Sequence, residues 1–141
     1  MNIAFFLTPK SEVVFLPLDT TLDSALARLE KARYTAVPLL DSEQKYAGTL
    51  TAADLLWYMK EHGLRFSDCA HVRVDAVPRS VVHRSVAIDA EIEDLFSLAA
   101  SQNFVPVHDD RGIFIGIVRR KAIIDFCVRE LGRTRANPAG E

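Results

Sequence analysis

The stretch YTAVPLLDSEQKYAGTLTAADLL, which spans Tyr34–Leu56, has a counterpart later in the chain, QNFVPVHDDRGIFIGIVRRKAII, at Gln102–Ile124. The two align without a gap, and identical or closely similar residues stand 68 positions apart in five pairs. These pairs are Val37 and Val105, Pro38 and Pro106, Asp41 and Asp109, Gly48 and Gly116, and Leu55 and Ile123. Because repetition at a fixed spacing marks a duplicated structural unit, the chain is predicted to fold as two copies of one motif.

Each copy is predicted to be a β-α-β-β-α unit of mixed α+β class. Apolar residues recur at helical spacing from Leu22 to Ala32 and again from Ile92 to Ala99, and each run predicts a helix. Short apolar runs separated by polar turns predict the strands, and a second helix follows the last strand of each copy. The predicted strands are Val13–Leu16, Ala36–Leu40 and Tyr46–Leu50 in the first copy, and Val81–His83, Phe104–His108 and Ile113–Val118 in the second.

The domain organisation follows from the size of these units. Because a unit of about 60 residues cannot cover both faces of its own sheet, we expect the two to pack sheet to sheet about a pseudo-two-fold axis. The predicted division is a first module at residues 1–60, a linker at 61–80, a second module at 81–135 and a flexible tail at 136–141.

Composition narrows the class of protein. With 141 residues, 49% hydrophobic and 26% charged, the chain is typical of a globular domain and not of a disordered one. A net charge of −2 gives no general attraction to nucleic acid or to an anionic membrane. The opening MNIAFFLTPK lacks the basic start and cleavage site of a signal peptide, and Cys69 and Cys127 form no disulfide or metal pattern. We therefore expect a cytoplasmic protein with no nucleic-acid or membrane partner.

Two short motifs carry a resemblance to a known family. RYTAVP, at Arg33–Pro38, resembles the pattern G-φ-[ST]-x-φ-P, where φ is apolar, and GTLTAADL, at Gly48–Leu55, resembles G-x-φ-[ST]-x-x-D-φ. Together with the doubled unit, they make Ile3–Leu131 resemble a pair of CBS (cystathionine-β-synthase) modules. Within that superfamily, YTAVPLLD, KYAGTL and NFVPV look most like the small stand-alone CBS-pair proteins of Gram-positive bacteria that act as cyclic di-AMP receptors.

The resemblance implies two clefts, because in CBS pairs the strands of one module face the helix start of the other. The first cleft would hold adenine between apolar and aromatic side chains, with Thr35 bonded to the nucleotide and the cations on its phosphates. Its residues would be Val13, Val14, Phe15, Tyr34, Thr35, Ala36, Arg119, Arg120 and Lys121. The second nucleotide cleft would join Thr51 and Asp54 to Val82, His83, Asn103, Phe104 and Val105.

The two predicted helix starts leave alternatives open. Thr51 and Asp54 have the spacing of a helix capping box, but a hydroxyl and a carboxylate at these positions also suit phosphate and ribose. In the second copy Arg119 stands where Thr51 stood, and Ala122 stands where Asp54 stood. Each cation at a helix N-terminus costs about 0.3–1 kcal/mol. The run Arg119–Lys121 therefore indicates either side chains extended into solvent or a site for phosphate.

No catalytic, phosphate-loop or dinucleotide motif is present, so we expect no enzymatic activity. The four histidines, His62, His71, His83 and His108, lack metal-ligand spacing, and we expect no metal and no cofactor. The prediction is a regulatory sensor for an adenine nucleotide, with cyclic di-AMP first; AMP or ATP, or a ligand-free scaffold, are the alternatives. The resemblance further implies a homodimer and a partner such as a (p)ppGpp synthetase or another metabolic enzyme.

Overall fold

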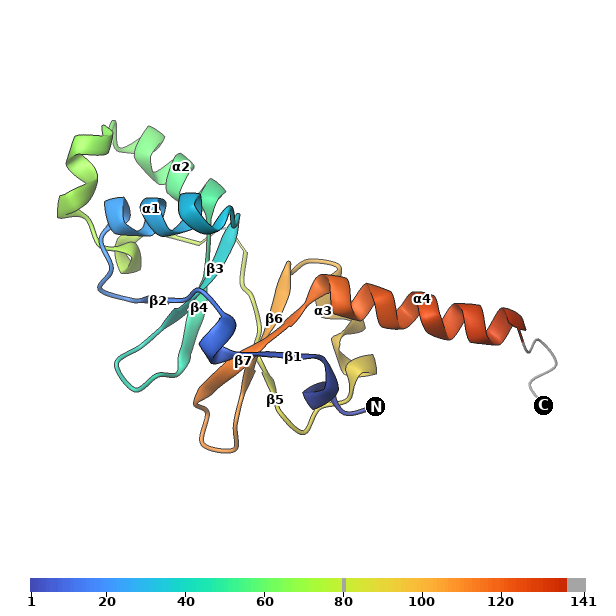
Figure 1. The fold of residues 1–141 in the computed structure, drawn as a ribbon. Coiled ribbons are helices and arrows are strands. Elements are labelled where there is room, and N and C mark those ends of the chain that lie inside the picture. Colours follow the sequence, from blue (N-terminus) through green and yellow to red (C-terminus); the bar gives the residue numbers. More distant parts are fainter. Residues whose placement is uncertain (80, 137–141) are drawn as a thin grey trace.

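The computed structural model describes residues 1–79 and 81–136, which form two lobes, each made of one sheet and its helices (Figure 1). In the first half the elements are β1 (Leu7–Pro9), β2 (Leu16–Pro17), α1 (Leu22–Ala32), β3 (Ala36–Leu40), β4 (Tyr46–Thr51) and α2 (Ala52–Glu61). In the second half they are β5 (Val86–Ala87), α3 (Phe96–Ala99), β6 (Phe104–His108), β7 (Phe114–Arg119) and α4 (Arg120–Ala136). Short 3-10 helices connect them at Ile3–Phe6, Lys10–Glu12, Phe66–His71, Val74–Ala76 and Ile92–Leu95.

The predicted repeat is confirmed for the two antiparallel strands of each half and the helix that follows them. Strands β3 and β6, strands β4 and β7, and the starts of α2 and α4 are each 68 residues apart. The antiparallel registers also match, since Ala36 pairs with Thr51 and Phe104 pairs with Arg119. The chain therefore has the tandem α+β architecture that the duplicated motif predicted.

The N-terminal strand belongs to the sheet of the second half. One sheet has the order β2-β3-β4 and the other the order β1-β7-β6-β5, in which β1 runs antiparallel to β7. Immediately before β1, the Ile3 amide donates to the Ala90 carbonyl oxygen at 3.1 Å. The segment after α2 is likewise bonded to the first half, because the Val74 amide donates to the Thr20 carbonyl oxygen at 2.8 Å. The predicted module boundaries at residues 60 and 81 stay a prediction. The structure adds that the N-terminal strand pairs with the second half and that the segment after α2 bonds to the first half.

Three predicted elements differ from the structure. The strands predicted at Val13–Leu16 and Val81–His83 were wrong in position, because parallel pairing with β3 and β6 falls on β2 and β5 instead. The apolar residues upstream pack or lie exposed without pairing to a neighbouring strand. The helix predicted over Ile92–Ala99 is divided into the 3-10 turn and α3, and α4 reaches Ala136, whereas the rest of the predicted tail lies outside the described residues.

Three apolar clusters hold the fold. One lies under α1 and α2, the second under α3 and α4, and the third joins the two sheets through Ala36, Leu40, Phe104, Phe114 and Ile117. The two hairpin turns also meet, since the Phe114 amide donates to the Gln44 carbonyl oxygen at 2.9 Å. The halves are thus packed against each other about a pseudo-two-fold axis, through residues of β3, β6 and β7.

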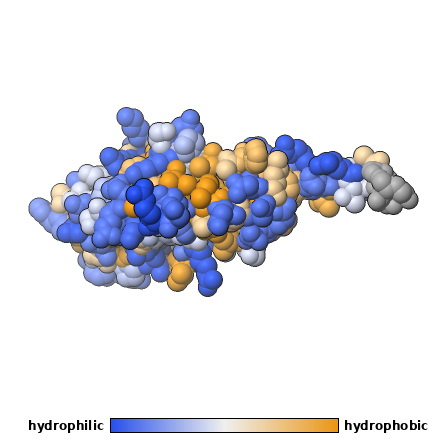
Figure 2. All heavy atoms as spheres, turned by 90° about the horizontal axis from the view of Figure 1, so that it is seen from below, coloured by the Kyte–Doolittle hydropathy of each residue, from blue (hydrophilic) through white to orange (hydrophobic). Residues whose placement is uncertain are grey.

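Large apolar side chains remain on the surface. Seen from below, hydrophobic residues gather over the middle of the molecule and hydrophilic residues cover its ends (Figure 2). Among the helical residues with exposed large apolar side chains are Leu56, Trp57, Phe96, Ile124, Val128 and Leu131. Within residues 1–79 and 81–136, every helix is too short or too polar to cross a membrane.

Candidate functional site

A cavity of about 300 Å³ opens between the two halves, at the start of α4. The first half contributes Val13, Val14, Tyr34, Thr35, Ala36 and Pro38. The second half contributes Asn103, Phe104, Ile117, Arg119, Arg120 and Lys121. Eight of the nine residues predicted for the first cleft therefore line one cavity, of a size at the lower end of small-molecule pockets.

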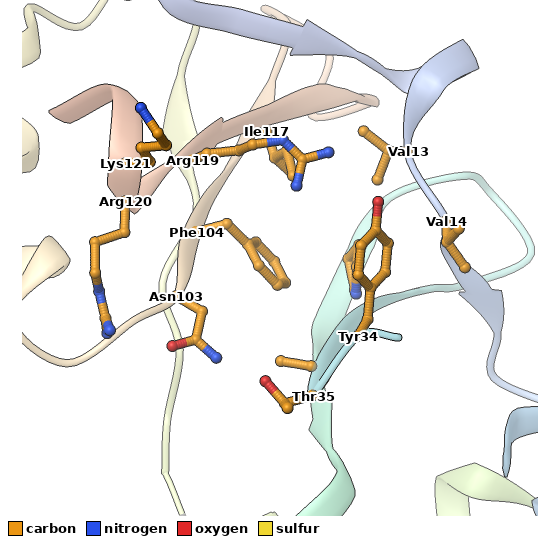
Figure 3. A pocket seen from close by; sticks show the side chains of 12 residues that line it. Val13, Val14, Tyr34, Thr35, Asn103, Phe104, Ile117, Arg119, Arg120 and Lys121 are labelled. Carbon is orange, nitrogen blue, oxygen red and sulfur yellow. The ribbon is translucent and has the colours of Figure 1, made fainter. Parts of the chain in front are cut away.

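The lining residues divide the cavity into chemically different parts (Figure 3). The Tyr34 and Phe104 rings project toward each other from opposite sides, and Thr35 and Asn103 face each other at the lower edge. The cations come from the end of β7 and the start of α4. The cavity thus has apolar walls, a polar edge and a positively charged side.

Local sequence explains why the two helix starts differ. In α2 the Thr51 hydroxyl oxygen accepts from the Asp54 amide at 3.0 Å, and the Asp54 carboxylate accepts from the Thr51 amide at 3.1 Å. This is the predicted capping box, and Asp54 is buried. At the matching positions of the second half, Arg119 and Ala122 cannot accept these bonds. The N-terminus of α4 is therefore left without the side-chain cap that α2 has.

The three cations make different contacts within the protein. The Arg119 guanidinium lies 5.9 Å from the centre of the Tyr34 ring and so bridges the two halves across the cavity. Arg120 Nε donates to the Gln102 carbonyl oxygen at 3.0 Å, and Lys121 Nζ lies 2.7 Å from the Asp125 carboxylate. Within the described residues, no carboxylate is within ion-pair distance of either arginine. Positive charge is therefore available to an anion in the cavity.

A buried glutamine that the sequence reasoning missed holds one wall in place. Gln102 is only 1% exposed, and its side-chain Nε2 donates to the carbonyl oxygens of Arg84 and Phe104 at 3.0 and 3.2 Å. Its Oε1 accepts from the Arg84 amide at 2.8 Å. The glutamine thereby fixes the segment that carries Asn103. In the repeat it occupies the position of Tyr34, but its burial depends on tertiary packing that no local pattern indicates.

Phe15, the ninth residue predicted for the first cleft, lies elsewhere. It is half-buried at the junction of the two sheets, with its ring centre 6.3 Å from that of Phe114 and the Lys10 amine 5.1 Å above it. There its ring packs against the apolar cluster that joins the two sheets instead of lining the cavity. Pro38 and Ile117 line the cavity and were not predicted for it.

The structure does not bring the residues predicted for the second cleft into one cavity. Asn103 and Phe104 line the first cavity instead, and Val105 is buried in the core of the second half. Thr51 and Asp54 line neither that cavity nor the hollow beside His83.

That hollow, of about 400 Å³, is formed by β4 together with Arg79 and residues 81–83, which include Val82 and His83. One of its walls is Tyr46, whose hydroxyl lies 2.6 Å from that of Thr49, and burial raises the pKa of Tyr46 to about 12. The predicted nucleotide role of Thr51 and Asp54 remains a prediction, and their observed role is the helix cap. Within residues 1–79 and 81–136, no group of three or more His, Cys, Asp or Glu side chains is arranged to hold a metal ion.

Comparison with known proteins agrees with the fold. Residues 6–61 match the model of the CBS domain family. A CBS domain protein from Streptococcus pneumoniae TIGR4 is 29% identical, with a TM-score of 0.79 over 91% of this chain and 87% of that one. Listeria monocytogenes CbpB, solved in complex with c-di-AMP, is 25% identical, with a TM-score of 0.78 over 92% of this chain and 97% of that one.

A curated relative is longer. The magnesium and cobalt efflux protein CorC of Pasteurella multocida is 25% identical over 132 residues, which are 93% of this chain and 42% of the relative. The chain thus spans about two fifths of that protein's length, and the similarity concerns this part alone.

Proposed function

We propose that this chain, which matches the CBS domain family over residues 6–61 and repeats the same fold in its second half, is a non-enzymatic sensor of an adenine nucleotide. Cyclic di-AMP is the first-choice ligand, and the cavity between the two modules is the site. Binding would change the surface that the protein offers to a partner in the cytoplasm.

The observation that carries the proposal is the make-up of this one cavity. Apolar and aromatic side chains from both modules suit a purine, and three cations from β7 and α4 suit its phosphates. Arg119 and Arg120 have no carboxylate partner among the described residues, so an anion would not have to break an ion pair to reach them. The likeness to a CbpB solved with c-di-AMP supports the same ligand class.

The number of phosphates decides between candidate ligands. The helix start at this cavity has Ala122 where the first module has Asp54, so it lacks the carboxylate that would bond ribose hydroxyls. A ligand with two phosphates meets more of the positive charge than AMP does. We therefore expect cyclic di-AMP to bind more tightly than AMP, with ATP or AMP as the second candidate.

A partner protein would complete the signalling role. The exposed apolar side chains of α2, α3 and α4 offer surface for a homodimer, which CBS pairs commonly form through their helices. A (p)ppGpp synthetase or another metabolic enzyme would be the regulated partner. The competing reading is a scaffold that dimerises and binds no nucleotide.

Calorimetry against cyclic di-AMP, AMP, ATP and S-adenosylmethionine tests the proposal. A ligand present at 100 times its dissociation constant should raise the free energy of unfolding by about 2.7 kcal/mol, which a thermal melt detects. Equal melting shifts with AMP and cyclic di-AMP at matched concentration would contradict the two-phosphate preference. A stable dimer with no heat and no melting shift for any nucleotide would favour the scaffold.

A further inference from the structure

We infer that Asn103 reads the edge of the ligand base and selects adenine over guanine in the cavity between the modules. The inference rests on the proposed function, because it assigns a specificity role within that site. Its basis is the position of Asn103, the chemistry of the other lining residues and the unused hydrogen-bonding groups of its side chain.

Asn103 is held by its backbone while its side chain stays free. The Asn103 carbonyl oxygen accepts from the Arg120 amide at 3.0 Å, at the junction of β6 and α4. The preceding Gln102 is fixed by three side-chain hydrogen bonds and accepts a fourth, from Arg120, on its carbonyl oxygen. Within the described residues the side-chain amide of Asn103 forms no hydrogen bond. Figure 3 shows this side chain at the edge of the cavity, opposite Thr35.

Among the residues that line the cavity, Asn103 has the side chain best suited to recognise the edge of a base. The cations at the start of α4 suit phosphate, and Phe104, Ile117 and the valines offer only apolar contact. The uncharged polar side chains that line the cavity are Tyr34, Thr35 and Asn103. Of these, only the amide of Asn103 presents a donor and an acceptor side by side in one plane.

This pair of groups matches the N6/N7 edge of adenine and not the corresponding O6/N7 edge of guanine. The adenine N6 amino group donates and the adjacent N7 accepts, so an amide that faces this edge can bond both at once. Guanine presents two acceptors on the edge with O6 and N7, where an amide satisfies only one. Discrimination by one such bidentate contact amounts to about a 10- to 100-fold difference in affinity.

The test compares cyclic di-AMP with cyclic di-GMP, two ligands with the same phosphates and different bases. Isothermal titrations of the wild type should give a ratio of dissociation constants of about 10 to 100 in favour of adenine. Asn103→Ala should bring that ratio close to one. Asn103→Asp should also lower it, because a carboxylate still accepts from the adenine N6 amino group but repels the acceptor N7 beside it.

A matched control separates base reading from general weakening. Lys121→Ala removes charge from the phosphate side, so it should weaken both ligands by the same factor and preserve the ratio. The exposed position of Asn103 makes folding of its variants expected, and thermal melts without ligand check it.

The outcomes are distinct. If both Asn103 variants weaken the two ligands equally or not at all, Asn103 does not read the base and the inference fails, although the proposed function survives. If the wild type binds neither cyclic dinucleotide but binds AMP or ATP, the same ratio measured with ATP and GTP decides the inference. If it binds no nucleotide, the proposed function fails and the inference falls with it.

Discussion

Rebuilding a helix cap on α4 would reveal why its start carries cations. The double variant Arg119→Thr with Ala122→Asp places on α4 the pair that caps α2, 68 residues earlier in the chain. Both helices follow their strands in the same register, and the first helical amide is bound alike in each. Ala52 donates to the Thr35 carbonyl oxygen at 2.8 Å, and Arg120 donates to that of Asn103 at 3.0 Å. The backbone is therefore already shaped for the box.

The expected gain in stability of the free protein is about 1 kcal/mol. A side-chain N-cap contributes typically ~1 kcal/mol, and exchanging a cation for an acid in the first turn adds about 0.3–1 kcal/mol. Against this stands the lost contact between Arg119 and the Tyr34 ring, worth roughly 0.5–1 kcal/mol at an exposed site. The melting temperature should rise by about 3–4 °C for a chain of this size.

The same change should damage the proposed site. Losing the charge of Arg119 and adding a carboxylate should weaken cyclic di-AMP by about 10- to 100-fold, which corresponds to a charged hydrogen bond of about 1.5–3 kcal/mol. Denaturant melts without ligand and calorimetric titrations measure the two effects. As the matched control, Thr51→Ala should cost ~1 kcal/mol of stability and leave the affinity unchanged. If the double variant is less stable than the wild type, or binds as tightly, the cations are structural and the reasoning is wrong.

Two further predictions concern the repeat itself. Gly48 and Gly116 both have positive φ, but a Cβ at Gly116 would overlap the Thr8 carbonyl oxygen of β1, whereas one at Gly48 would meet the flexible Arg79 side chain at 2.9 Å. In chemical melts Gly116→Ala should therefore lower the free energy of unfolding by about 3 kcal/mol or more, and Gly48→Ala by about 1–2 kcal/mol. Equal losses of stability in the two variants would contradict the close approach of β1 to Gly116. Hydrogen bonds from the backbone amides of Ile113 and Arg111 hold the pKa of the Asp109 carboxyl below its usual range. The stability that the ionised Asp109 provides is therefore fully present above about pH 4, and it is lost as the pH falls through the lowered pKa. Asp109→Asn, which keeps an acceptor but does not titrate, should flatten the pH dependence of unfolding in acid; an unchanged slope would refute this.

Local patterns predicted the elements well where local interactions decide them. The aligned copies placed β3, β4, β6 and β7 to within a residue or so, and the TAAD spacing identified the cap of α2 because both partners lie in one turn. The first cleft was largely predictable because family motifs position its strand and helix start. Those motifs fix backbone positions relative to one another.

Non-local packing decided what the sequence could not reveal. Phe15 is apolar whether it faces a ligand or Phe114, so only the assembled sheets show which. Asn103 and Phe104, which were predicted for the second cleft, line the first cavity instead, together with Ala36, the residue that matches Phe104 in the repeat. The burial of Gln102 and the pairing of β1 with β7 likewise depend on distant segments.

The exchanged strand β1 has a consequence for how the protein is made. Leu7 pairs with Val118, about 110 positions later in the chain, so this contact has one of the largest sequence separations in the fold. A ribosome adding about 5–20 residues per second would hold β1 without its partner for several seconds. During that interval the exposed Phe5 and the unpaired strand edge beside it present an apolar, hydrogen-bonding surface that chaperones or a second nascent chain would recognise. When two neighbouring chains are synthesised on one messenger, β1 of one chain can pair with β7 of its own chain or with β7 of the other. The pairing of β1 with the second half, which ties the modules together, therefore also provides a route to domain-swapped dimers.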